Sequence, residues 1–265
     1  MPDAVHATQL EFRYGDRLAL AGVSFSVAPA SIFALLGPNG GGKTTLFRIL
    51  ATLARPHAGT FTVAGETAPR TVRRKLGVVF QSPSLDKKLT VLENMLFGGA
   101  LFGLSGASLR KRAEELLARF SVADRSADLV ETLSGGLARR VEIAKSLLHR
   151  PEVLLLDEPS TGLDPVARRD LRGVLHSLSR DERVTVLLTT HLFEEADAAD
   201  HIAILDRGHL VAEGTPAELK RSLSGDVLVV EPREEEPSAD LAAAITQRFG
   251  DAAGRVAAVS GLVRL

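Results

Sequence analysis

Short apolar runs recur along the chain, and each is followed by glycine or polar residues: Ile32–Leu36, Gly77–Phe80, Val153–Leu156 and Val184–Leu188. Runs of this length between turn residues are typical of strands that are buried on both faces of a parallel sheet. Segments with helical spacing lie between them, including Thr45–Leu53 directly after the first run. The alternation predicts an α/β fold with a mainly parallel sheet.

Alternating segments near the N-terminus predict a second, antiparallel β layer. They are Thr8–Arg13, Val23–Val27 and Thr60–Val63, with a turn at Tyr14-Gly15-Asp16. Runs of β-branched and aromatic residues that alternate with polar ones, bounded by turn residues, are typical of half-buried strands. We therefore expect this layer to stand beside the parallel sheet.

The pattern becomes helical between Gln81 and Leu133, which predicts an inserted helical subdomain over about residues 84–133. Apolar residues that recur every three or four positions form one face of a helix. Basic and acidic residues flank this face. Its members are Leu109, Ala113, Leu116, Leu117 and Phe120.

The C-terminal part predicts the end of one domain and a short addition. His201–Leu205 and Leu210–Glu213 resemble a hairpin, and Thr215-Pro216-Ala217-Glu218 is typical of a helix start. We expect one domain over residues 1–225 and a small accessory segment over 226–265, whose function is not predicted. The segment should contain a strand, Val227–Val230, and a helix, Leu241–Phe249.

A glycine-rich segment, GPNGGGKTT at Gly37–Thr45, follows the first apolar run. Glycine, four free positions and Gly-Lys-Ser/Thr predict a loop whose backbone N–H groups surround phosphates at the start of a helix. Lys43 can reach the outer phosphates, and the hydroxyl of Thr44 can bind Mg²⁺. Taken alone, the segment can also be a chance glycine turn.

Two adjacent carboxylates, Asp157 and Glu158, follow the run Val153–Leu156. Neighbouring residues of a strand point to opposite sides, so one carboxylate can serve a metal and the other a water molecule. We assign Asp157 to Mg²⁺ and Glu158 to polarising the water that attacks a phosphate. An isolated Asp-Glu pair is more often a solvated pair of surface acids.

Four chemical groups are expected to meet at one edge of the sheet. Gly37, Gln81, Asp157 and His191 each follow a predicted strand, and ligands of open parallel sheets gather beyond the carboxyl ends of the strands. Gln81 can offer its carbonyl oxygen to Mg²⁺ or to the water, and His191 can donate toward the terminal phosphate. Singly, each would be an ordinary surface residue. The shared edge favours a site that binds and hydrolyses ATP.

A Ser-Gly-Gly sequence at Ser134–Gly136 opens another helical pattern, Leu133–Leu148, in which Ser134 can simply be a helix cap. In this order, however, the motifs resemble the ATP-binding cassette (ABC) family over about residues 5–220. The resemblance implies a P-loop NTPase core, ATP and Mg²⁺ as ligands, and a homodimer in which Ser134–Gly136 of one copy covers the nucleotide held by the other.

The resemblance also implies a role for each matching residue. Asp164 would link the two sites of the dimer, His191 would be the switch histidine, and Tyr14 would stack on adenine. Tyr14 can alternatively be a packing residue of the predicted hairpin. The implied ATP-binding residues are Tyr14, Gly37, Pro38, Asn39, Gly40, Gly41, Gly42, Lys43, Thr44, Thr45, Ser134, Gly135, Gly136 and Asp164, with Thr44, Gln81 and Asp157 at the metal and Glu158, His191 and Gln81 in hydrolysis.

Two positions depart from the pattern of the family. Leu137 stands where the family often has Gln after the signature glycines, and Ala30-Ser31 stand where it often has Gly-Glu. Leu137 removes a polar side chain near the expected dimer interface, which could weaken the closed dimer. Because Glu158 remains, we expect an active Mg²⁺-dependent ATPase.

Composition narrows the set of partners. The 265 residues carry a net charge of −1, with 32 basic and 33 acidic residues, so no bulk attraction to nucleic acid or anionic lipid is expected. The absence of cysteine excludes disulfides and thiolate metal sites. The start at Met1-Pro2-Asp3-Ala4 has no secretory signal, and Leu18–Gly42 contains no apolar run long enough to span a membrane. We expect a cytoplasmic protein that reaches the membrane through another subunit.

The resemblance implies a subunit that powers a separate membrane permease, and is strongest for the branch serving exporters of drugs, polysaccharides or lipids. The helical subdomain would dock on the permease through Ser84–Thr90 and Met95–Leu104, whose glycines and aromatics can equally be local packing. The alternative is a soluble ABC-type ATPase that acts on DNA or ribosomes. Relatives that tether DNA carry long coiled coils, and this sequence has no sustained heptad pattern that would predict one. A sensor that does not hydrolyse ATP is disfavoured by Lys43, Asp157 and Glu158.

Overall fold

The computed structural model of the chain describes residues 2–223, 229–230, 243, 246–248, 257–259 and 262–264. Two compact units divide the chain, Met1–Pro216 and Ala217–Leu265. The boundary expected at residue 225 stays a prediction. The expected strand Val227–Val230 is described only at its last two residues, and most of the expected helix Leu241–Phe249 lies outside the described residues.

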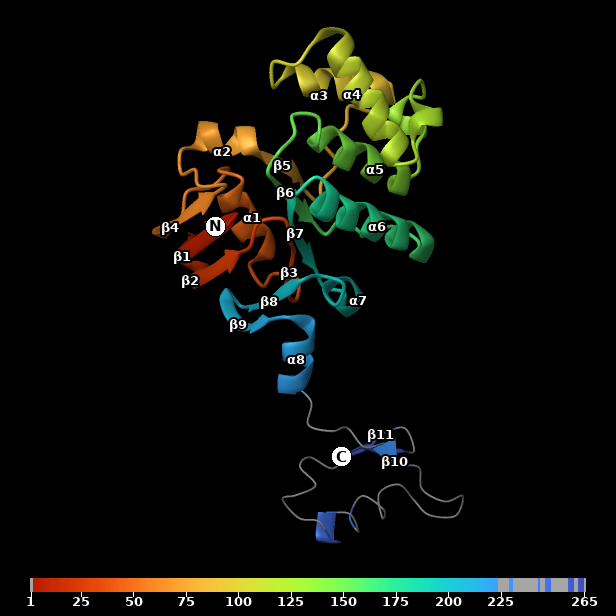
Figure 1. Ribbon diagram of the computed structural model, residues 1–265. Coiled ribbons are helices and arrows are strands. Elements are labelled where there is room, and N and C mark those ends of the chain that lie inside the picture. The colour runs from red at the N-terminus through yellow and green to blue at the C-terminus, as the bar shows by residue number, and fades with distance from the viewer. Residues whose placement is uncertain are drawn as a thin grey trace. The chain divides into compact units, whose positions relative to one another are not determined.

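A six-stranded sheet forms the centre of the first unit, in the order β5-β6-β7-β3-β8-β9 (Figure 1). Its strand pairs are parallel except for β8 and β9, which form the predicted hairpin. Every residue of β3, β6 and β7 is buried, which explains the apolar runs at the centre of these strands. The strands are β3 (Ile32–Leu36), β5 (Leu76–Val79), β6 (Val153–Asp157), β7 (Thr185–Thr190), β8 (His201–Asp206) and β9 (His209–Gly214).

The predicted antiparallel layer is a three-stranded sheet in the order β2-β1-β4. Its strands, β1 (Val5–Tyr14), β2 (Arg17–Val27) and β4 (Ala58–Val63), extend beyond the predicted segments because pairing continues to the turns. Tyr14 pairs with Arg17 at the closed end of the β1–β2 hairpin. The two sheets share one hydrophobic core, in which Leu10 and Phe33 are buried together with residues of the helix after β3. The core therefore holds the end of this hairpin near that helix.

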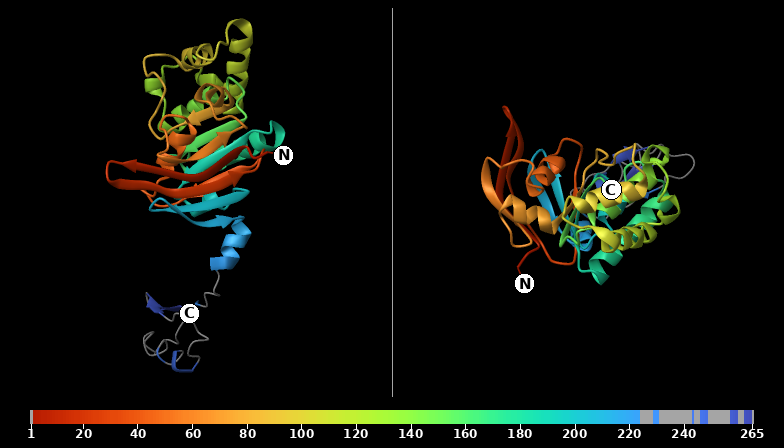
Figure 2. Two further views of the ribbon diagram at one scale, coloured as in Figure 1. Left: turned by 90° about the vertical axis from the view of Figure 1, so that its left-hand side faces the viewer. Right: turned by 90° about the horizontal axis from the view of Figure 1, so that it is seen from above.

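Helices cover the sheet and form a separate group at one end of the unit. In Figures 1 and 2, α3 and α4, which fall within the predicted helical subdomain, gather with α5 at the end away from the antiparallel sheet, and α5 begins beyond the predicted limit at residue 133. Thr90 begins α3 with a capping box that the sequence analysis did not identify. The helices are α1 (Lys43–Leu50), α2 (Pro69–Lys75), α3 (Val91–Ala100), α4 (Gly106–Arg119), α5 (Gly135–Ser146), α6 (Pro165–Asp181) and α7 (Phe193–Ala196), with 3₁₀ turns η1 (Ala123–Arg125) and η2 (Val130–Thr132).

Two predicted helices have different ends in the structure. The helix expected over Thr45–Leu53 is α1, which begins at Lys43 and ends at Leu50 because Thr52 has a left-handed backbone with φ 60°. The helix expected over Leu133–Leu148 is α5, which begins at Gly135 because Ser134 is its N-cap.

The second unit contains most of α8 (Pro216–Leu223) and a three-stranded antiparallel sheet in the order β10-β12-β11. Its strands are β10 (Val229–Val230), β11 (Ala257–Val259) and β12 (Leu262–Arg264). Across the residues that the structure describes, no helix combines the length and the apolar composition needed to cross a membrane.

Candidate active site

The loop between β3 and α1 depends on glycine. Gly42 is the N-cap of α1 and has φ 112°, which L-residues rarely adopt. A Cβ atom there would lie 2.6 Å from the carbonyl oxygen of Ala19. No side chain caps the helix, so its first N–H groups and the positive end of its dipole face the loop, as an anion site requires.

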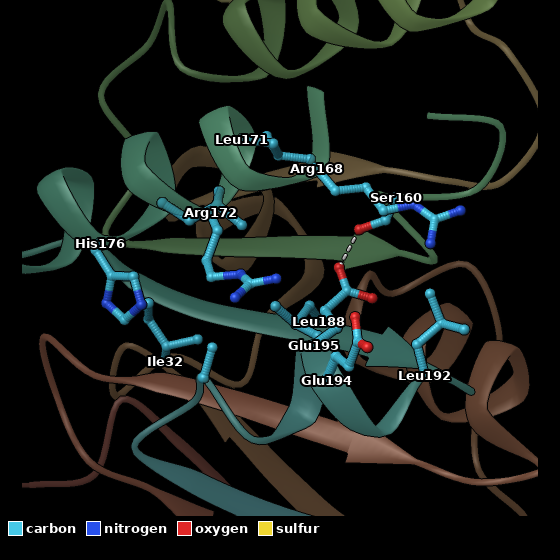
Figure 3. A pocket seen from close by; sticks show the side chains of 12 residues that line it. Ile32, Ser160, Arg168, Leu171, Arg172, His176, Leu188, Leu192, Glu194 and Glu195 are labelled. Atoms are coloured by element: carbon cyan, nitrogen blue, oxygen red, sulfur yellow. Dashed lines mark hydrogen bonds between the residues drawn. The ribbon is translucent and has the colours of Figure 1, made fainter. Parts of the chain in front are cut away.

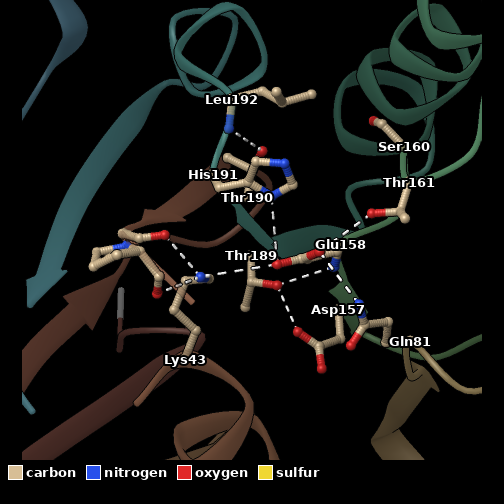
Figure 4. Close-up of polar contacts among 12 residues, drawn as sticks. Lys43, Gln81, Asp157, Glu158, Ser160, Thr161, Thr189, Thr190, His191 and Leu192 are labelled. Atoms are coloured by element: carbon tan, nitrogen blue, oxygen red, sulfur yellow. Dashed lines mark hydrogen bonds and ion pairs between the residues drawn. The ribbon is translucent and has the colours of Figure 1, made fainter. Parts of the chain in front are cut away.

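Lys43 is the first residue of α1, and its side chain is only 5% exposed. Its Nζ donates to the carbonyl oxygens of Gly37 at 2.7 Å and Pro38 at 3.0 Å, and lies 3.8 Å from Oε1 of Glu158. Burial lowers the pKa of Lys43, while Glu158 and Asp157 oppose this shift. Figure 4 shows the ammonium group between the loop and the carboxylates. The ammonium group is thus held by its own loop beside the carboxylates, in a position from which it can reach phosphate oxygens.

Asp157 is the last residue of β6 and is 1% exposed. Oγ1 of Thr44 donates to its Oδ2 at 3.0 Å, and Oγ1 of Thr189, on the neighbouring strand β7, donates to its Oδ1 at 2.6 Å. Mg²⁺ in phosphate sites is held by one or two carboxylates together with hydroxyl, water and phosphate oxygens. The oxygens of Thr44 and Asp157 therefore fit a magnesium ion.

The carboxylate of Glu158 contacts side chains from three loops. Nε2 of Gln81 donates to Oε2 at 3.5 Å, Oγ1 of Thr161 donates to the same oxygen at 3.2 Å, and Nδ1 of His191 lies 3.5 Å from Oε1. Figure 4 shows these groups around the carboxylate, with Lys43 also close. Glu158 has φ 48°, a left-handed conformation that is uncommon outside glycine. The edge of the sheet thus brings together the residues expected there.

A cleft of about 350 Å³ opens beside these groups and reaches the end of the β1–β2 hairpin. Tyr14 lies in its wall, is 49% exposed and makes an edge-to-face contact with Phe12, with ring centroids 4.9 Å apart. Tyr14 is therefore supported by Phe12 and still accessible from the cleft, which suits stacking on a planar ligand. The lining residues are Tyr14, Arg17, Ala19, Asn39, Gly40, Gly42, Lys43, Thr44, Thr45, Gln81 and Glu158.

Ser134–Gly136 and Asp164 do not line this cleft. Oγ of Ser134 accepts the N–H of Leu137 at 3.3 Å and caps α5, and Oδ1 of Asp164 accepts the N–H of Ala167 at 2.8 Å and caps α6. Ser134, Gly135 and Asp164 are exposed. Within one chain Ser134 and Asp164 are therefore helix caps on the surface, and a role at a nucleotide requires a second copy.

Three further residues near the site were missed by the sequence analysis. Arg17 lines the cleft, Thr189 bonds Asp157, and Arg139 reaches the carbonyl oxygen of Asp157 at 2.6 Å from α5. The only signal for Thr189 was that the apolar run of β7 ends in Thr189-Thr190. Arg139 has none, because it is one of two adjacent arginines in a helical segment, where a charged side chain is expected to be solvated.

A second pocket separates α6 from α7 and contains charges of both signs. Figure 3 shows Arg168, Arg172 and His176 on the side of α6, facing Glu194 and Glu195. Oγ of Ser160 donates a short hydrogen bond to Oε1 of Glu195. This bond joins the loop after Glu158 to the helix after His191, so the two loops support each other.

Comparison with known proteins identifies the family. The sequence profile described as ABC transporter matches residues 20–161, which is more than half of the chain. The chain belongs to the ABC transporter family. The family that the order of the motifs indicated is thus confirmed.

Named relatives of this ABC protein include ATP-binding proteins of drug resistance and export. The daunorubicin resistance ATP-binding protein DrrA3 of Streptomyces coeruleorubidus is 45% identical over 235 residues, which cover 87% of this chain and 74% of that protein. The Nod factor export ATP-binding protein I of Paraburkholderia xenovorans (strain LB400) is 43% identical over 237 residues, which cover 87% and 77%.

Solved ABC cassettes share the fold. MJ1267, an ATP-binding cassette of an ABC transporter in its ADP conformation, superposes with a TM-score of 0.76 at 25% identity, covering 85% of this chain and 96% of that chain. The dimeric bacterial ABC transporter cassette MJ0796 has a TM-score of 0.73 at 28% identity, covering 80% and 98%. The predicted P-loop NTPase fold is confirmed, and the chain is an ABC ATPase.

Proposed function

We propose that this ABC ATPase is the subunit of an exporter that hydrolyses ATP and drives a separate membrane permease. The proposal rests on Lys43 and Glu158, which line one cleft, and on Asp157, which accepts a hydrogen bond from Thr44 in the wall of that cleft. These groups can bind the phosphates, accept a proton and bind a metal. The names of the relatives DrrA3 and Nod factor export protein I support export rather than import.

The residues in and beside the cleft that the sequence motifs indicated have distinct proposed parts in ATP binding and hydrolysis. Tyr14 stacks on adenine, and the N–H groups of Gly37–Thr45 and the ammonium of Lys43 hold the phosphates. Glu158 accepts a proton from the attacking water, while His191 and Gln81 orient the water and the terminal phosphate around it.

The proposal includes Mg²⁺ as cofactor, held by Thr44 and Asp157 with Gln81 nearby. The ion would neutralise negative charge on the phosphate oxygens. Thr189 then has a supporting part, because its hydrogen bond to Oδ1 leaves Oδ2 of Asp157 directed at Thr44.

The proposal also includes a head-to-tail homodimer. Ser134, Gly135 and Asp164 are exposed in one copy, and a second copy would place them on the nucleotide across the interface. ATP then acts as part of the interface, and hydrolysis removes the contacts of its terminal phosphate, so that nucleotide shifts a two-state equilibrium between closed and open dimer.

Substitution of Gly135 tests this dimer. A Cβ at Gly135 meets nothing within 4 Å, so Gly135→Asp should fold normally as a single chain and place a carboxylate against the phosphates of the other copy. We expect the ATP-dependent dimer of the Glu158→Gln protein to be lost in size-exclusion chromatography with light scattering. Gly173→Asp, on α6 with the same open surroundings, is the matched control and should still dimerise. Dimers that survive Gly135→Asp would contradict the arrangement.

The proposed permease contact lies on the helical subdomain. Phe97 and Leu101 are 66% and 78% exposed, whereas Met95 is fully buried and Gly99 packs on Leu109. The expected surface Met95–Leu104 therefore divides into residues that pack locally and residues that remain available. Through this surface the protein would sit at the inner face of the cell membrane.

Affinity purification tests the permease directly. Tagged Glu158→Gln protein, held with ATP in membranes of its native cell, should recover a multi-span protein in mild detergent, identified by mass spectrometry. Recovery should be lost in Leu101→Asp and kept in Val211→Asp, which changes an equally apolar residue that is 59% exposed on β9. Recovery of ribosomes or DNA in place of a membrane protein would support the soluble alternative.

A further inference from the structure

A buried ion pair lies on α5 outside all the motifs of the sequence. Arg139 and Glu142 are 8% and 4% exposed, and Nη1 of Arg139 lies 3.3 Å from Oε2 of Glu142. Burial lowers the pKa of Arg139, and Glu142 opposes this shift. Buried charges are costly unless they are paired and fully hydrogen-bonded, so the remaining partners of the pair show what it holds.

The guanidinium of Arg139 joins two backbone carbonyls from distant parts of the chain. Nη1 donates to the oxygen of Phe80 and Nη2 to the oxygen of Asp157, both at 2.6 Å. Phe80 directly precedes Gln81, and Asp157 directly precedes Glu158. The guanidinium of Arg139 therefore fixes the distance between the backbone segments that lead into Gln81 and Glu158, the two residues that meet at the proposed water site.

Glu142 extends this connection along the loop after Gln81. Its Oε1 accepts a short hydrogen bond from the backbone N–H of Ser84. Arg139 and Glu142 thus hold the loop at Phe80 and again at Ser84, both from α5.

The peptide between Asp157 and Glu158 is held on both sides. Nη2 of Arg139 donates to the carbonyl oxygen of this peptide, and its N–H, which belongs to Glu158, donates to Oγ1 of Thr189 at 2.9 Å. Glu158 has φ 48°, and such a backbone persists in a non-glycine residue only where its surroundings enforce it. These two hydrogen bonds act on the peptide that leads into the strained residue.

We propose that Arg139 is a positioning residue for ATP hydrolysis, which holds the Asp157–Glu158 peptide and the start of the Gln81 loop so that the carboxylate of Glu158 faces the attacking water. The inference rests on the proposed role of Glu158 as the proton acceptor. Lysine cannot replace this function, because an ammonium group lacks the rigid planar fork that spans two carbonyls.

Arg139→Lys tests the proposal by steady-state kinetics. We expect kcat to fall by about 10–100-fold, since a displacement near 1 Å costs up to that much, with KM for ATP within about twofold because the cleft is untouched. Arg140→Lys is the matched control, since Arg140 donates its hydrogen bonds to Phe120 and Asp170 and not to the carbonyls that Arg139 holds, and it should keep wild-type kcat. Thermal melting compares the folding of all variants.

A double-mutant cycle separates positioning from a merely structural role. In single-turnover assays, Arg139→Lys should cause no further loss in Glu158→Gln protein, because both changes remove the same contribution. If Arg139→Lys does not fold, Arg139→Gln/Glu142→Gln, which leaves no buried charge unpaired, is measured in its place and should give the same loss of kcat.

Three results would overturn the inference: normal kcat in the folded Arg139 variant, a rise in KM alone, or a full additional loss in the Glu158→Gln background. Normal turnover in Glu158→Gln itself would instead remove the proposed role of Glu158. The turnover of the Glu158→Gln protein therefore distinguishes failure of the proposed function from failure of the positioning role of Arg139.

Discussion

Glu158→Gln is expected to lower ATP hydrolysis by about 10²–10⁴-fold while ATP binding is preserved, the range typical for the loss of a general base. The amide keeps the size of the side chain and its contacts with Gln81 and Thr161, but it cannot accept a proton from water at neutral pH. Phosphate release and equilibrium binding of ATP, measured on the same preparation, check the two halves of this prediction.

Glu152→Gln is the matched control for this change. Glu152 precedes β6, the strand that Glu158 follows, but it is exposed and pairs with Lys75 far from the cleft. Its neutralisation should leave hydrolysis unchanged. If Glu158→Gln retained near-normal turnover, another residue would have to activate the water.

Lys43→Ala should weaken ATP binding by about 10–150-fold, which corresponds to the roughly 1.5–3 kcal/mol typical of a hydrogen bond to a charged group. The ammonium is buried and already directed by the carbonyls of Gly37 and Pro38, so little side-chain freedom is lost when phosphate binds. Titration calorimetry with a non-hydrolysable ATP analogue measures the change.

Lys88→Ala is the control for the loss of a positive charge. Lys88 is exposed and pairs with Glu131, so its removal should leave ATP affinity within about twofold, as expected for a surface ion pair. Unchanged affinity in Lys43→Ala, with the fold intact by circular dichroism, would show that the backbone of the loop binds the phosphates without the ammonium.

The parts of the fold predicted from sequence are those whose pattern is local. The buried strands β3, β6 and β7 each contain at least three consecutive apolar residues, and the residues that follow these strands meet at one edge for topological reasons alone. Helix ends were less accurate, because a residue such as Thr52 ends α1 through its backbone conformation rather than through its composition.

Tertiary contacts explain what the sequence did not predict. The sequence suggests that Arg139 is a solvated helix residue, because a charged side chain usually lies exposed. Only the packing of α5 near the ends of β5 and β6 makes it a buried partner of two carbonyls. Met95 lies in a segment of exposed aromatics, but the side of α3 on which it falls faces the neighbouring helices. Neither fact follows from periodicity.

The N-cap of α5 explains why Leu137 can stand where the family often has Gln. Ser134 accepts a hydrogen bond from the backbone N–H of Leu137, a group that every residue except proline possesses, so the turn does not depend on the side chain at that position. A hydroxyl that accepts in this way still carries its own hydrogen and is polarised toward donation. It is therefore selective for a partner rich in lone pairs, and a phosphate oxygen meets that condition where the amino group of a base does not.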